Sequence, residues 1–150
     1  ISAVKAESIK HLIKHFHTIK PNRHEAEVLA GFELKSDWDL KKAADYFRSQ
    51  GVINVFISLD EDGIFYYDGS EHGRIKAQNV VIKNVTGAGD AFVAGLGHGY
   101  LNGLKIIDTA KFAMSMSIIA IQHEETINPN LDIDYVQRVI DETHWEVITY

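Results

Sequence analysis

Residues 52–59 read VINVFISL, an almost unbroken run of apolar and β-branched side chains. A run of this length and composition predicts a β-strand that is covered on both faces, as in a parallel sheet between helices. A helical pattern precedes it, because residues 36–51 open with Ser36 and Asp39 at capping-box spacing and end at Gly51. The run therefore restricts the chain to a layered α/β fold.

The rest of the chain shows the same alternation of helix and strand, with a hairpin in the middle. This order predicts a largely parallel sheet with an antiparallel edge. We expect helices at about 3–16, 23–31, 36–51, 89–101, 105–122 and 132–143, and strands at 17–22, 52–59, 64–68 and within 73–83.

Length, charge and cysteine content exclude several classes of function. The 150 residues are a length typical of one domain, and the net charge of −6 gives no reason to expect nucleic acid or an anionic membrane as a partner. Cysteine is absent, which excludes a disulfide framework and fits a cytoplasmic protein. The first residues show no signal-peptide pattern. Because the sequence begins at Ile1 rather than Met, we expect it to be a piece of a longer polypeptide.

A glycine turn, NVTGAGDAF at residues 84–92, stands at a predicted strand-to-helix junction. Gly87 and Gly89 allow tight backbone conformations and the close approach of a ligand. The following amides would lie at a helix N-terminus, where an anion is favoured. Asp90 has two interpretations: it caps the helix, or it accepts a proton from a hydroxyl beside the anion.

Two well-known phosphate-binding motifs do not fit this turn. A P-loop requires lysine directly after its last glycine, where this chain has Asp90. The dinucleotide-binding fingerprint requires a third glycine at the position of Phe92, which disfavours a Rossmann dehydrogenase.

Three segments together carry a family resemblance. TGAGDAFVAG at 86–95 resembles the C-terminal signature of the ribokinase-like, or PfkB, family of carbohydrate and nucleoside kinases. KPNRHEAE at 20–27 resembles the Asn-x-x-Glu segment of that family, and SLDEDGIFYY at 58–67 resembles its nucleotide-side hairpin. The resemblance implies a three-layer α/β/α fold, of which residues 1–150 are the C-terminal, nucleotide-binding part and the N-terminal half is absent.

Within the family, NVTGAGDA and ETINPNLD are most similar to the pseudouridine kinases. The resemblance implies an ATP-dependent phosphotransferase that acts on a hydroxyl of a ribosyl or sugar substrate. Pseudouridine is the first choice of acceptor, and a free sugar, as in the ribokinases and fructokinases, is the alternative.

The resemblance also assigns roles to residues. Asp90 would be the catalytic base, and Gly87, Ala88 and Gly89 would form the anion hole for the transferred phosphoryl group. Asn22 and Glu25 would place Mg²⁺ and the ATP phosphates, with Glu25 as the metal residue. Further nucleotide-binding candidates are Ser58, Asp60, Thr86 and Met114, although Met114 also fits a plain core position.

Two positions depart from the family pattern. Many members have glycine where this chain has Asp60, so a carboxylate there either crowds the nucleotide or faces water. Asn84 replaces an aspartate that helps to hold a monovalent cation. An amide oxygen still coordinates K⁺, with less charge, which leaves K⁺ activation open.

Two other interpretations concern partners and metals. A half-domain exposes a sheet edge and apolar surface, so we expect the piece to associate with itself or with its missing half and to be inactive alone, or to bind nucleotide without turnover. His11 and His15 are four residues apart on a predicted helix, but no glutamate follows His11 as in zinc proteases, so a solvated helix face is expected.

Overall fold

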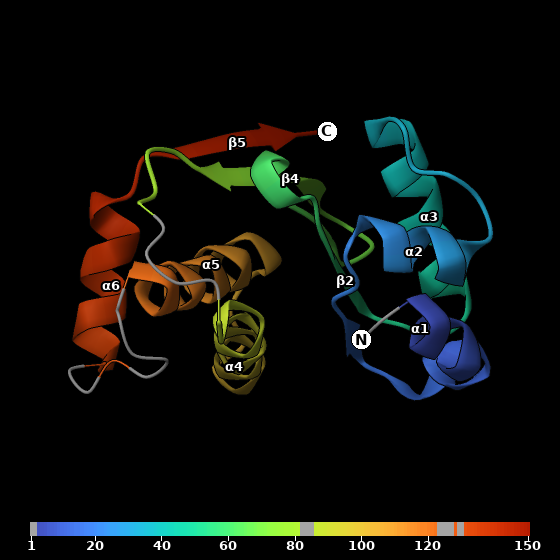
Figure 1. Ribbon diagram of the computed structural model, residues 1–150, viewed down its shortest axis with the longest axis horizontal. Coiled ribbons are helices and arrows are strands. Elements are labelled where there is room, and N and C mark those ends of the chain that lie inside the picture. The colour runs from blue at the N-terminus through green and yellow to red at the C-terminus, as the bar shows by residue number, and fades with distance from the viewer. Residues whose placement is uncertain (1–2, 82–85, 123–127, 129–130) are drawn as a thin grey trace. The chain divides into compact units, whose positions relative to one another are not determined.

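The computed structural model describes residues 3–81, 86–122, 128 and 131–150, and the chain forms two compact units. The first unit comprises Ile1–Arg74 and Val147–Tyr150, and the second comprises Ile75–Glu146. The elements (Figure 1) are α1 (Ala3–Ile9), η1 (Lys10–His15), β1 (Thr18–Ile19), α2 (Arg23–Ala30), α3 (Asp37–Ser49), β2 (Asn54–Ser58), η2 (Asp60–Asp62), β3 (Ile64–Tyr67), β4 (His72–Ala77), α4 (Ala88–Leu101), α5 (Ile106–Gln122), α6 (Ile133–Glu142) and β5 (Trp145–Thr149).

The described strands form one sheet in the order β1-β2-β3-β4-β5, and its pairing is mixed. β1 and β2 are parallel, with Ile19 opposite Val55. β2 and β3 are antiparallel, with Val55 opposite Tyr67. The prediction of an α/β fold with strands at these places is confirmed, and β5 is a strand that the sequence analysis did not predict.

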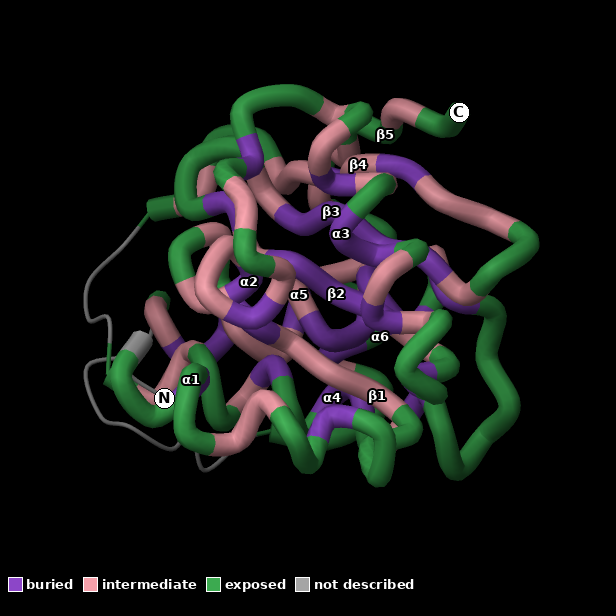
Figure 2. Tube along the Cα trace, turned by 90° about the vertical axis from the view of Figure 1, so that its right-hand side faces the viewer, coloured by how far each residue is buried: buried purple, intermediate pink, exposed green. Residues whose placement is uncertain are grey.

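The core of the first unit lies between β2, β3 and the helices α2 and α3. Figure 1 shows α1, α2 and α3 on one side of β2, and Figure 2 shows the buried residues gathered along these strands and helices. The fully buried side chains of this core include Phe47 of α3, Val55 and Ile57 of β2, and Phe65 of β3. The apolar run that predicted a covered strand therefore does supply the centre of this unit.

The N-terminal helical segment differs from its prediction. We expected one helix from about residue 3 to 16, but the α-helix ends at Ile9 and a 3₁₀ helix continues to His15. Ile9 has φ −101° and ψ 0°, which breaks the α-helical geometry. Over so few residues, apolar spacing cannot distinguish 3.6 from 3.0 residues per turn.

The capping box predicted for α3 is present. Ser36 Oγ accepts a hydrogen bond from the Asp39 N–H at 3.3 Å, and Asp39 Oδ2 accepts one from the Ser36 N–H at 3.0 Å. Both amides are thereby paired at the exposed start of the helix.

The second unit is built on two helices whose backbones lie very close together. A Cβ atom added to Gly95 of α4 would lie 2.4 Å from Ala113 Cα of α5, and one added to Gly99 would lie 2.5 Å from Thr109. The later glycine of α4 meets the earlier residue of α5, so the two helices run antiparallel. On another face, α5 packs Phe112 and Ile119 against Val136 of α6.

The turn between β2 and β3 contains a residue in a conformation that L-amino acids rarely adopt. Asp60 has φ 51°, and Gly63 at the other end of η2 has φ 82°. The Gly63 N–H donates to the Asp60 carbonyl at 3.2 Å, which closes the turn. A left-handed conformation explains why glycine suits position 60, although aspartate tolerates it better than most residues.

No helix within the described ranges is both long and apolar enough to cross a bilayer.

Two glycine substitutions on α4 should change stability in opposite directions. Gly95→Ala should lower the free energy of unfolding by about 1–3 kcal/mol, because Ala113 backbone cannot move aside easily. Gly97→Ala is the control, since its Cβ would meet no described atom within 4 Å. It should raise stability by about 0.5–1 kcal/mol through helix propensity. Urea unfolding of the three chains measures both, and equal effects would contradict the close α4–α5 contact.

The conformation of Asp60 gives a second prediction. Asp60→Val should destabilise the chain by about 1–2 kcal/mol relative to Asp60→Gly, because a β-branched residue is strained at positive φ. Glu61→Val is the control at an exposed neighbour without positive φ. Thermal unfolding followed by circular dichroism compares them, and equal losses for positions 60 and 61 would refute the left-handed turn.

Candidate functional site

The glycine turn forms the N-terminus of α4 in the second unit. Gly87 is the N-cap, with φ 84° and ψ −9°, a conformation that favours glycine. The Ala91 N–H donates to the Gly87 carbonyl at 2.9 Å. The amides of Ala88, Gly89 and Asp90 come before this bond, so they have no carbonyl four residues earlier within the helix. This arrangement favours an anion at the helix start.

The second glycine is not explained by the protein's own packing. A Cβ atom at Gly89 would meet no described atom within 4 Å, and Gly89 is exposed. Its backbone is helical, and φ is not positive. A helical glycine costs roughly 0.5–1 kcal/mol relative to alanine. The absence of a side chain therefore leaves open space beside the amides and makes room for no other described part of the protein.

Asp90 does not cap the helix. The N-cap is Gly87 and makes no side-chain capping bond, and Asp90 is the third helical residue. Its side chain is exposed, and a carboxylate in the first turn interacts favourably with the helix dipole. Of the two interpretations left open by the sequence, the cap is wrong, and the proton acceptor stays a prediction.

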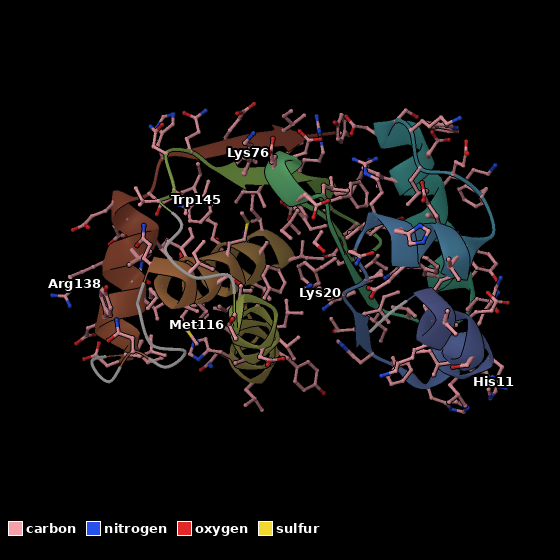
Figure 3. All side chains as sticks on the ribbon, in the orientation of Figure 1. His11, Lys20, Lys76, Met116, Arg138 and Trp145 are labelled. Carbon is pink, nitrogen blue, oxygen red and sulfur yellow. The ribbon has the colours of Figure 1, made fainter. Side chains whose placement is uncertain are left out.

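A hydroxyl from a distant part of the second unit holds this turn. Ser117 Oγ of α5 donates to the Ala88 carbonyl at 2.7 Å. Sequence analysis missed Ser117, because nothing near it in the sequence marks a residue 29 positions from its partner. Met114 is half-buried on the same helix, whereas Met116, labelled in Figure 3, packs with the α5–α6 core. Thr86, the residue before Gly87, is exposed.

A second group of candidates lies in the first unit, at the carboxyl ends of β1 and β2. Asn22 is the N-cap of α2, and its Oδ1 accepts from the Glu25 N–H at 2.8 Å. Glu25 Oε2 accepts in return from the Asn22 N–H at 3.0 Å. The two residues are therefore brought together, but as a reciprocal capping box. A carboxylate has further lone pairs after this bond, so a second role for Glu25 is compatible with the cap.

Ser58 joins this group. Asn22 and Ser58 form an isolated parallel bridge beyond the two strands. The Ser58 N–H donates to the Pro21 carbonyl at 3.0 Å, and its Oγ lies 3.5 Å from the same oxygen. Asp60 follows on η2 and is exposed. Arg23 Nη2 lies 3.9 Å from Asp62 Oδ2, which links the start of α2 to this turn.

Lys20 also belongs to this group, although the sequence analysis did not select it. It contributes with Glu25 to a pocket of about 230 Å³ whose other walls are largely apolar. Burial lowers the pKa of the Lys20 ammonium group, and the charge of Glu25 opposes that shift. The signal that could have found Lys20 is its place directly before Pro21 and Asn22 at a strand end.

Several predicted residues cannot be located or assembled into a metal site. Asn84 and most of the segment ETINPNLD at 125–132 lie outside the described residues. Among the residues that are described, no three histidine, aspartate or glutamate side chains cluster as a metal site would require. His11 is exposed, as Figure 3 shows, which agrees with a solvated helix face.

Sequence comparisons place these residues in a known family. The pfkB family carbohydrate kinase profile matches residues 1–133. Pseudouridine kinase from Escherichia coli K12 is 36% identical over 142 residues, which are 94% of this chain and 45% of that protein. 1-Phosphofructokinase from the same strain is 34% identical over 103 residues, or 69% of this chain and 33% of that protein. The chain thus spans less than half the length of these relatives.

Solved structures agree with the sequence relatives. One described as "a putative sugar kinase from Clostridium perfringens" has a TM-score of 0.95 and 60% identity, and the match covers 99% of this chain and 47% of that one. Phosphofructokinase-2 from E. coli has a TM-score of 0.79 at 20% identity, over 93% and 45% of the two chains, which shows the fold alone. The chain belongs to the pfkB family of carbohydrate kinases.

Proposed function

We propose that this chain is the C-terminal, nucleotide-binding part of an ATP-dependent kinase that phosphorylates a hydroxyl of a ribosyl or sugar substrate. Pseudouridine is the first acceptor to consider, because the E. coli pseudouridine kinase matches nearly the whole chain. A sugar such as ribose or fructose is the second, since a ribokinase is also a relative.

The observation that carries the proposal is Gly89. It stands in the first turn of α4, where a side chain would meet no described atom, among amides that have no carbonyl acceptor four residues earlier within the helix. Gly97 has the same open surroundings, but only Gly89 lies in the first turn, beside those amides. A ligand that must approach the backbone closely, such as a phosphoryl group, accounts for the glycine.

The chemistry follows from the neighbouring groups. The amides of Ala88, Gly89 and Asp90 would hold the transferred phosphoryl group and stabilise its charge. The acceptor hydroxyl would give its proton to the Asp90 carboxylate as its oxygen bonds to the γ-phosphorus. The bond from that phosphorus to the β–γ bridging oxygen breaks, and ADP leaves. Asp90 is exposed, which leaves it accessible to an acceptor.

Six residues would contact the nucleotide: Asn22, Glu25, Ser58, Asp60, Thr86 and Met114. Glu25, with Asn22, would hold Mg²⁺ through water. A single carboxylate and several waters suit that ion, which neutralises phosphate charge when it is bound. K⁺ activation through Asn84 stays part of the proposal.

The 150-residue chain alone should not phosphorylate any acceptor. It spans 45% of the pseudouridine kinase, and the remaining length would supply most acceptor contacts. Large apolar side chains of α4 are exposed, with Tyr100 at 63% and Leu101 at 82%. These favour association with the missing half or with a second copy.

Asp90→Asn tests the proposed base. In the whole polypeptide that contains this chain, it should lower kcat by about 10²–10⁴-fold, because the amide cannot accept the hydroxyl proton. Assays of ATP consumption with pseudouridine, ribose and fructose, with and without K⁺, measure the effect. Asp108→Asn is the matched control, since Asp108 is the third residue of α5 and exposed. Full activity of Asp90→Asn would show that Asp90 is not the catalytic base and only interacts with the helix dipole.

Gly89→Ala should separate stability from activity. Helix propensity should raise the free energy of unfolding by up to about 1 kcal/mol, because the methyl group meets no described atom. The same methyl group should obstruct the phosphoryl group and lower kcat/KM by about tenfold or more. Gly97→Ala should stabilise α4 similarly without affecting turnover. Unchanged kcat/KM in Gly89→Ala would show that no ligand approaches this backbone.

A further inference from the structure

We infer that Ser117 is a positioning residue that orients the Gly89 amide for phosphoryl transfer. The inference rests on the proposed function of the glycine turn, and it concerns a residue outside the motif. All of the atoms involved lie within the second unit.

The first step is the register between α4 and α5. Gly99 lies against Thr109, and Gly95 lies against Ala113. Thr109, Ala113 and Ser117 are spaced by four residues and so share one face of α5. The face that meets the glycines of α4 therefore continues to Ser117, which reaches the first residue of α4.

The second step is the hydrogen bond itself. Ser117 Oγ donates to the Ala88 carbonyl at 2.7 Å, which is a normal length for a hydroxyl donor. Serine in a helix often bonds to a carbonyl of its own preceding turn. This hydroxyl instead donates across to the neighbouring helix, at a partly buried position.

The third step is peptide geometry. The Ala88 carbonyl and the Gly89 N–H belong to one planar trans peptide unit, so they point in opposite directions. A donor that fixes the carbonyl also fixes the direction of the N–H. Gly89 has no Cβ to restrict its backbone. Ser117 therefore adds a restraint on the direction of the Gly89 N–H to the one that the first turn of α4 already provides.

Ser117→Ala tests this role in the whole polypeptide. The variant should lower kcat by about tenfold, less than the roughly 10²-fold that a misplacement of about 1 Å can cost, with KM for the acceptor unchanged. Ser117→Thr keeps the hydroxyl and should restore most of the loss. Ser115→Ala is the matched control, because Ser115 Oγ is buried on the same helix without a hydrogen-bond partner among the described atoms. It should retain wild-type kcat.

A second readout does not depend on activity. In the whole polypeptide that contains this chain, the ¹⁵N order parameter of Gly89 should fall in Ser117→Ala and stay at the wild-type value in Ser115→Ala and Ser117→Thr. An unchanged order parameter, or wild-type kcat in a folded Ser117→Ala, would overturn the inference. If wild type phosphorylates no acceptor while the order parameter still falls, the hold on Gly89 is supported and the proposed function fails separately.

Discussion

The close approach of α4 and α5 is the contact on which the glycine turn depends. Gly95 and Gly99 have no side chains, so the two backbones lie nearer to each other than alanine would allow. This proximity brings α5 within hydrogen-bonding reach of the Ala88 carbonyl. The start of α4 is consequently held by a helix that comes later in the chain, in addition to the turn's own hydrogen bond from the Ala91 N–H to the Gly87 carbonyl.

In the first unit, the residues proposed to bind the nucleotide also stabilise the fold. Asn22 and Glu25 satisfy each other's backbone amides, and that pairing fixes the entry of the chain into α2. The box also places a carboxylate just beyond the ends of two parallel strands, where open α/β sheets bind ligands. Under the proposed function these two residues would contribute both to stability and to nucleotide binding, so loss of activity in a variant has to be judged beside its stability.

The sequence predicted what depends on local patterns. The capping box of Ser36 and Asp39 is present, and the start of α4 lies within one residue of its expected place. Asp90 was open to interpretation as a cap because the sequence does not show that Gly87 adopts a left-handed conformation and begins the helix. β5 was missed because the strand beside it, β4, is far away in the sequence. Next to these two strands, the Gln78 N–H donates to the His144 carbonyl. Ser117 could not be predicted for the same reason.

The two tryptophans fall in different units, with consequences for spectroscopy. Trp38 is 75% exposed at the start of α3. Trp145, labelled in Figure 3, is half-buried, and its Nε1–H donates to the Ile140 carbonyl at 2.8 Å. Unfolding moves an exposed indole from water to water, whereas Trp145 loses a hydrogen bond and an apolar environment. The change in tryptophan fluorescence on unfolding therefore reports mainly on the unit that carries the glycine turn.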